Sequence, residues 1–280
     1  MPLAARAGGS YRPSMTTPTL SPPAIAVTYV GGPTVAIDVC GMRFLTDPTF
    51  DEPGPYRSGT VELAKVEGPA VAVESLGPID LVLLSHDQHP DNLDRAGRAL
   101  VGRVPTLTTP AGAARLGGPA IGLAPWETKT FVTAGGCRLQ VTATPARHGP
   151  AGIEPMLGDV TGFMVSSLEP ARDLFYVSGD TVWFEGTAEI ARRFSPLAVV
   201  LFTGAARTRG PFHLTADTND AVEFATAFRD ATIIPVHHAG WAHYTESQAD
   251  LLRTFEVLRL ADRVRPVAPA ATITVAAPRR

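Results

Sequence analysis

The apolar positions of the chain form short strand-like blocks in its first half and alternate between strand-like and helix-like blocks in its second half. Strands are predicted where β-branched, aromatic and aliphatic residues recur between Gly, Pro and Asp residues. The predicted strands are residues 24–30, 34–39, 43–46, 81–84, 106–107, 129–133, 138–144, 174–177, 197–202, 232–236 and 272–275. Several of them, such as 81–84, are continuous apolar runs, which is typical of strands buried on both faces.

Helical spacing of apolar residues predicts helices over residues 93–101 and 218–228. A third helix is predicted near the C-terminus, where Thr245 and Gln248 have the spacing of a capping box and precede an apolar stripe that begins at Leu251. The Pro- and Gly-rich residues 49–58 are predicted to form a long loop, and loops of this length are often functional.

The pattern also predicts the domain organisation. Residues 1–23 show little periodicity and are predicted to form a flexible leader. No break in composition divides the remainder, so residues 24–280 are predicted to form one α/β domain in which helices cover sheets, with a frayed basic end.

Potential metal ligands follow four of the predicted strands directly. His86, Asp87, His89 and Asp91 follow strand 81–84, His148 follows 138–144, Asp180 follows 174–177, and His237 and His238 follow 232–236. Ligand sets of α/β folds gather outside the carboxyl ends of strands. So many imidazoles and carboxylates at strand ends would need a cation to neutralise them, and the sequence therefore predicts a metal site.

The ligand types narrow the chemistry of this site. Neutral imidazoles and carboxylates suit zinc, with manganese or iron as alternatives, and Cys40 and Cys137 are too few for a cage of thiolates. A catalytic site is expected, because water must complete the coordination. Bound zinc lowers the pKa of that water to about 7, which provides hydroxide at neutral pH.

Six motifs carry a resemblance to a known family. They are TYVGGPTVAID, FLTDPTFD, LLSHDQHPDNLD, TPARHG, YVSGDT and IIPVHHAGWAHYTES, and they occur in this order between residues 28 and 247. With these motifs the chain resembles the metallo-β-lactamase-fold hydrolase superfamily, nearest to its ascorbate-phosphate-lactonase-like and N-acylphosphatidylethanolamine-phospholipase-like branch. The resemblance implies a four-layer αββα sandwich with one or two zinc ions at an edge of the paired sheets.

The resemblance also implies roles for individual residues. It assigns the first metal to His86, His89 and His148, the bridging position to Asp180, and the second metal to Asp91 and His237. Two positions depart from the family pattern: one extra residue separates His86 from His89, and Asn92 stands where a histidine is expected. Asn92, His238 and Asp87 are therefore uncertain ligands. Gly32 likewise replaces a histidine that is frequent in this branch.

The predicted activity is hydrolysis of an ester, lactone, amide or phosphodiester by metal-bound hydroxide. Asp91, if it binds the metal only weakly or lies behind the ligands, is predicted to hold and deprotonate the nucleophile. The resemblance implies that His243 faces the cleft and orients the substrate or donates a proton. Two alternatives remain open: a metal-binding or ligand-sensing scaffold with a degenerate second site and little turnover, and a redox site that uses iron and dioxygen.

A small-molecule substrate is the expected partner, with Trp183, Trp241 and His213 as predicted contacts. The pocket walls are predicted from residues 49–58, 183–186, 203–215 and 240–244, where Arg207 and Arg209 could hold a phosphate or carboxylate. The net charge of -3 and pI near 6.2 argue against a nucleic-acid partner. No apolar run reaches the ~18 residues of a membrane span, so a cytoplasmic protein, with homo-oligomerisation as the base expectation, is predicted.

Overall fold

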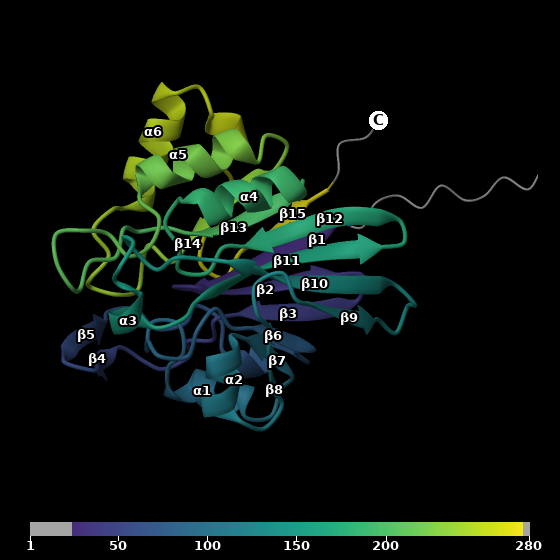
Figure 1. Cartoon of the computed structure of the whole chain (residues 1–280), viewed down its shortest axis with the longest axis horizontal. Coiled ribbons are helices and arrows are strands. Elements are labelled where there is room, and N and C mark those ends of the chain that lie inside the picture. The colour runs from purple at the N-terminus through teal and green to yellow at the C-terminus, as the bar shows by residue number, and fades with distance from the viewer. Residues whose placement is uncertain (1–23, 277–280) are drawn as a thin grey trace, which may run out of the picture.

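The computed structural model describes residues 24–276, whose strands form two large sheets packed face to face (Figure 1). The predicted leader, residues 1–23, and the basic end, residues 277–280, lie outside this range. The first sheet has seven strands in the order β15-β1-β2-β3-β6-β7-β8. Their bounds are β15 Thr272–Val275, β1 Ile25–Gly31, β2 Thr34–Val39, β3 Met42–Thr46, β6 Leu81–Leu83, β7 Thr106–Thr108 and β8 Ala120–Gly122.

The second sheet has six strands in the order β14-β13-β12-β11-β10-β9, and a separate small sheet pairs two further strands. The bounds in the second sheet are β14 Thr232–Val236, β13 Ala198–Phe202, β12 Ala171–Val177, β11 Thr161–Leu168, β10 Arg138–Pro145 and β9 Thr128–Val132. The small sheet is a hairpin of β4, Gly54–Ser58, and β5, Val61–Lys65.

Helices cover the outer face of each large sheet (Figure 1). The helices of the described residues are α1 Arg95–Val101, α2 Pro110–Leu116, α3 Glu154–Leu157, α4 Glu185–Arg193, α5 Thr218–Ala227 and α6 Gln248–Val257, with short 3₁₀ helices at Val73–Leu76 and Ala261–Arg263. Of these, α3 packs against the loop after β13 rather than on a sheet face. Apolar side chains of α1 pack on the first sheet, and those of α4, α5 and α6 pack on the second. A third apolar cluster fills the space between the sheets. The predicted αββα sandwich is confirmed.

The direction of the strands brings the predicted ligands to one region. β3 and β6 are parallel neighbours in the first sheet, while β12, β13 and β14 run parallel in the second. β10 is antiparallel to β11, which is antiparallel to β12, so β10 and β12 point the same way. The two sheets are joined at this end, where the Thr161 N–H donates to the Ser85 carbonyl at 3.0 Å.

Several local predictions were wrong. Only the first part of the predicted loop 49–58 is a loop, because the residues from Gly54 onward form strand β4 of the hairpin. The central strand β11 was not predicted, nor were α2 and α4. The last helix begins at Gln248 rather than beside Thr245: the Thr245 hydroxyl donates to the Ala205 carbonyl at 2.7 Å, and the capping box consists of Ser247 and Asp250. No helix within residues 24–276 is long and apolar enough to cross a membrane.

Candidate metal centre and active site

Four predicted ligands form a first group at the strand ends. His86, His89, His148 and Asp180 each offer one ligand atom within 4.8 Å of the others. His86 Nε2 lies 2.8 Å from His89 Nδ1, and His148 Nε2 lies 3.2 Å from the same atom. The extra residue between His86 and His89 therefore does not separate their rings, because the turn after β6 lets both enter the group.

The hydrogen bonds of His148 show which of its ring nitrogens can bind a metal. Nδ1 lies 2.8 Å from the carbonyl oxygen of Leu214, which can only accept a hydrogen bond, so Nδ1 carries the proton. Burial lowers the pKa of His148, and its ring is neutral at neutral pH. The lone pair of Nε2 therefore points at His89 and at Asp180 Oδ2, 3.5 Å away.

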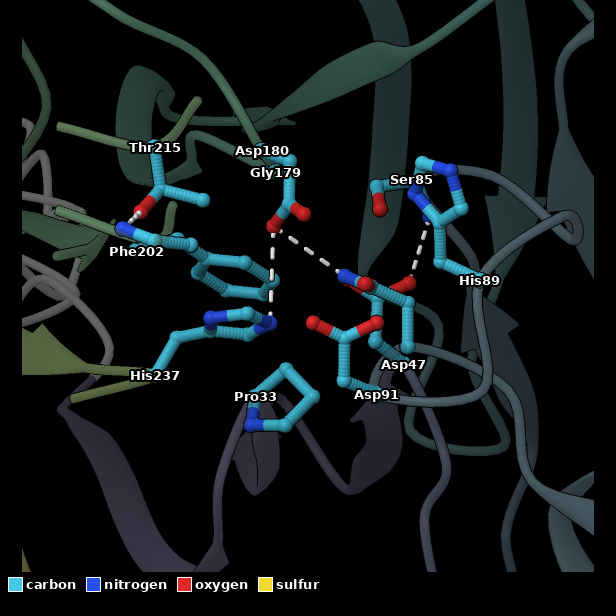
Figure 2. Close-up of polar contacts among 12 residues, drawn as sticks. Pro33, Asp47, Ser85, His89, Asp91, Gly179, Asp180, Phe202, Thr215 and His237 are labelled. Carbon is cyan, nitrogen blue, oxygen red and sulfur yellow. Dashed lines mark hydrogen bonds and ion pairs between the residues drawn. The ribbon is translucent and has the colours of Figure 1, made fainter. Parts of the chain in front are cut away.

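A second group shares Asp180 with the first. Asp91, Asp180 and His237 offer ligand atoms within 4.8 Å of one another, and all three side chains are buried. His237 Nε2 lies 3.5 Å from Asp180 Oδ1, while the other oxygen of Asp180 faces His148. Figure 2 shows the carboxylates of Asp91 and Asp180 and the ring of His237 pointing toward one another. Asp180 thus lies between the two groups.

Burial governs the electrostatics of both groups. It lowers the pKa of His86 and His89 as well, and it lowers that of His237 to about 4. Burial raises the pKa of Asp180 to about 6, against the opposing effect of His148. For Asp91, burial would raise the pKa, but the hydrogen bond and charge of His243 outweigh it and hold the pKa below its ordinary value.

The residues present fit a metal ion on these grounds. Neutral imidazoles present lone pairs to one another and to buried carboxylates, so the site has an excess of acceptors over donors. In addition, Oδ2 of the buried Asp47 and Oδ1 of the buried Asn92 have no hydrogen-bond partner within the described residues. A divalent cation would satisfy such an excess, and imidazole nitrogens with carboxylate oxygens suit zinc, manganese or iron.

Asn92 and Asp47 lie beside the second group. The Asn92 side chain is fully buried and donates through Nδ2 to Asp180 Oδ1 at 3.1 Å, while its own Oδ1 has no partner in the described part of the chain. Asp47 follows β3 and accepts from the Ser85 N–H at 2.6 Å (Figure 2). Burial raises the pKa of Asp47 well above its usual range. The strand-end rule that found the other ligands would have found Asp47 too, at the end of strand 43–46.

His243 contacts the second group from the segment after β14. Its Nε2 lies 2.9 Å from Asp91 Oδ2, and Tyr244 places its hydroxyl 3.4 Å from His237 Nε2. The main-chain carbonyl of His243 accepts from the Arg207 N–H at 3.0 Å, which ties this segment to the loop after β13. The structure thus brings together the two residues for which proton transfer was predicted, Asp91 and His243.

A narrow cleft leads to these groups. On its polar side lie His89, Asp91, His148 and His243. Apolar residues of the hairpin and of the loop after β13, namely Val61, Leu63, Ala206 and Leu214, form the other side. Ser58, Thr208 and Arg209 complete the lining. Of the predicted pocket walls, residues 183–186 contribute nothing to this lining, whereas β5, which was not predicted, does.

None of the three predicted substrate contacts lines this cleft. Trp183 packs edge-on against Phe224 of α5, with ring centroids 5.0 Å apart. Trp241 is buried against Tyr56 of the hairpin, with centroids 5.1 Å apart. His213 places Nε2 3.1 Å from Asp220 Oδ2 at the start of α5.

Two of the uncertain ligands also face away from the groups. Asp87 forms an ion pair with Arg115, whose Nε donates to its Oδ2 at 3.0 Å. His238 stacks on Tyr29 with ring centroids 6.4 Å apart, and neither residue is part of the two ligand groups. β14 ends at Val236, and His237 adopts a left-handed turn with φ 61°, so its ring leaves the strand direction and enters the second group.

Comparisons with known proteins agree with this geometry. A family model described as the beta-lactamase superfamily domain matches residues 42–238. The UPF0173 protein YddR of Bacillus subtilis (strain 168) is 24% identical over 234 residues, which cover 80% of this chain and 90% of that protein.

Two solved structures are similar over nearly their whole length. Isothiocyanate hydrolase from Delia radicum gut bacteria superposes with a TM-score of 0.74 and 24% identity, covering 90% of this chain and 100% of that chain. A possible metal-dependent hydrolase from Veillonella parvula DSM 2008 gives a TM-score of 0.75 and 18% identity, covering 89% and 99%. At these identities the two structures support the fold.

Proposed function

Because the chain belongs to the beta-lactamase superfamily, we propose that it is a metal-dependent hydrolase that cleaves an ester, lactone, amide or phosphodiester bond of a small-molecule substrate. The proposal includes zinc as the metal, held as two ions per chain. His86, His89 and His148 would hold the first ion, Asp91 and His237 the second, and Asp180 both. The lack of thiolates and the predominance of imidazole among these ligands support zinc.

The observation that carries the proposal is the position of Asp180. One of its oxygens lies 3.5 Å from His148 Nε2 and the other lies 3.5 Å from His237 Nε2. A buried carboxylate costs more free energy than water or a hydrophobic residue in the same place. A purely structural role would therefore not explain a carboxylate between the imidazoles of the two groups. The burial of Asp180 is explained if this carboxylate is a ligand shared by two cations.

When bound, such ions supply Lewis acidity, which makes water more acidic and polarises the bond under attack. The protein residues then handle the protons. Asp91, whose pKa is held below its ordinary value, stays ionised and holds the attacking water by accepting a hydrogen bond from it, and the proton of that water passes to the Asp91–His243 pair. His243 Nε2, 2.9 Å from Asp91 Oδ2, is placed to pass a proton to the leaving group. The apolar side of the cleft, with Leu63 and Leu214, limits the access of bulk water.

The test is a hydrolysis assay of zinc-loaded protein on a panel of chromogenic esters, lactones, amides and phosphodiesters. We expect turnover of at least one class, and a loss of roughly 100-fold or more in kcat/KM for His148→Ala. Trp183→Phe, a change outside the cleft, is the matched control and should retain activity. If protein with stoichiometric metal hydrolyses no member of the panel, the proposal is wrong.

A scaffold without turnover is the second candidate, and the buried amide of Asn92 favours it, since an amide is a weaker ligand than imidazole. Asn92→His separates the two functions. A large gain in second-metal occupancy together with newly acquired hydrolysis would indicate that the unmodified chain is the scaffold. Substantial turnover by the unmodified chain would exclude the scaffold.

A further inference from the structure

Arg209 lies in the cleft beside the candidate metal groups. It belongs to the loop between β13 and α5 and lines the same cleft as His89, Asp91 and His243. Its guanidinium reaches across the opening to the hairpin, where Nη1 approaches the Thr60 hydroxyl at 3.5 Å. Arg209 therefore sits where a substrate must pass to reach the ligand groups.

The guanidinium of Arg209 is partly buried and lacks acceptors for its N–H groups. Its Nε is buried and has no hydrogen-bond partner among residues 24–276. The contact with Thr60 is at the long limit of a hydrogen bond. Within the described part of the chain, no carboxylate forms an ion pair with Arg209, whereas Arg43 pairs its Nε and Nη2 with both oxygens of Asp38 at 2.8 and 2.9 Å. The guanidinium of Arg209 thus lines the cleft without a carboxylate partner among the described residues.

An oxyanion fits the guanidinium of Arg209 by charge and by shape. A planar guanidinium binds carboxylate or phosphate through two parallel hydrogen bonds, and such charged bonds are about twice as strong as neutral ones. Burial of an unsatisfied cationic donor is unfavourable, so an anionic group bound in the cleft would offset this cost at Arg209. Val61 and Leu63 lie in the same cleft and suit a short apolar segment between that group and the bond that is cleaved.

We infer that Arg209 binds an anionic group of the substrate, so that the substrate class is a small carboxylate- or phosphate-bearing molecule with a short apolar segment. The inference rests on the proposed function for the reaction, but the anion-binding step can be tested separately. Arg207 is the matched control: it lies two residues away on the same loop, it is exposed, and its side chain does not line the cleft.

The experiment compares two esters of similar length, mono-4-nitrophenyl glutarate and 4-nitrophenyl pentanoate, with spontaneous hydrolysis subtracted. For Arg209→Met we expect kcat/KM on the glutarate ester to fall ~10–100-fold and that on the neutral ester to change less than about threefold. Arg209→Lys should recover part of the loss, and Arg207→Met should leave both rates unchanged. Equal losses on both esters, or no loss with Arg209→Met, would overturn the inference while leaving the hydrolase function intact.

If neither ester is hydrolysed, calorimetric binding of glutarate and of inorganic phosphate to the zinc-loaded protein decides the matter. A loss of about tenfold or more in affinity with Arg209→Met but not with Arg207→Met supports the anion site even though the proposed reaction is then unsupported. The stronger binder of the two probes identifies the preferred anion. Equal affinities of the two variants would refute the inference, and circular dichroism establishes that both are folded.

Discussion

Replacement of Gly97 by alanine should destabilise the protein, although alanine normally favours helix over glycine by about 1 kcal/mol. Gly97 lies in the first turn of α1, where a Cβ atom would come within 1.8 Å of the Pro48 carbonyl oxygen and 2.8 Å of its carbon. Since real Cβ contacts are essentially never under 3.0 Å, α1 and the Pro48 segment would have to separate by roughly 1.2 Å.

The cost follows from what this separation disrupts. Overpacking of a core contact costs about 1–3 kcal/mol, and here the obstacle is backbone, so we expect a net loss of about 2–3 kcal/mol after the helix-propensity gain. The helix also carries Asp94, which caps it by accepting from the Gly97 N–H at 2.9 Å. Asp91 lies three residues before this cap, and we expect its metal to bind more weakly in the variant.

Gly102 provides the matched control within the same helix. It is exposed, has φ -66° and ψ -13°, and a Cβ there would meet its nearest neighbours at 3.6 Å. Gly102→Ala should therefore stabilise the protein by about 0.5–1 kcal/mol. Urea denaturation of the two variants and the unmodified chain measures both changes. A Gly97→Ala protein at least as stable as the unmodified one would show that the contact with Pro48 is not tight, and the reasoning would be wrong.

Two further predictions concern other parts of the fold. Lys65 Nζ donates to Asp94 Oδ2 at 3.0 Å with both side chains almost fully buried, so Lys65→Met should cost about 3–5 kcal/mol by leaving a buried carboxylate unpaired, whereas the exposed Lys129→Met should change stability by less than about 0.5 kcal/mol. A small effect of Lys65→Met in urea denaturation would show that the pair contributes little. The hydrogen bond that His213 donates to Asp220, with the charges of Asp217, Asp220 and Glu246, raises the pKa of His213. The stabilisation from this pair is therefore fully present below the unfolded pKa of about 6.5 and is lost as pH rises through the raised folded pKa, and the stability difference between the unmodified chain and His213→Gln should shrink toward pH 8.5. A difference that does not vary with pH would contradict this origin of the shift.

The positions of the ligands were predictable because each follows a strand whose apolar run is visible in the sequence. His86, His148, Asp180 and His237 all occur at such ends, and parallel strands place their ends together. The same periodicity predicted most strands of both sheets. The central strand β11 was missed, since its sequence TGFMVSSL mixes small polar residues with apolar ones although nearly all of them are buried. Its burial depends on neighbours from both sides of the sheet rather than on its own pattern.

The lining of the cleft was harder to predict, because it depends on contacts between segments far apart in the sequence. Trp183 and His213 lie near the site along the chain, but local partners hold them: Phe224 of α5 for the tryptophan, and Asp220 for the histidine. Conversely, Arg207 and Arg209 were equivalent in the sequence, and only the path of the loop after β13 directs Arg209 into the cleft. Side-chain direction in an irregular segment has no periodicity from which it can be predicted.

The most direct test of the account is the zinc content of the reconstituted protein, measured by elemental analysis for the unmodified chain, His148→Ala, Asp180→Ala and the control Trp183→Phe. Asp180 lies between the two ligand groups, so we expect two zinc ions per chain in the unmodified protein and in the control, a reduced content in His148→Ala, and the largest loss in Asp180→Ala. A chain that binds no stoichiometric zinc, or an Asp180→Ala protein that binds as much as the control, would contradict a metal centre built around Asp180.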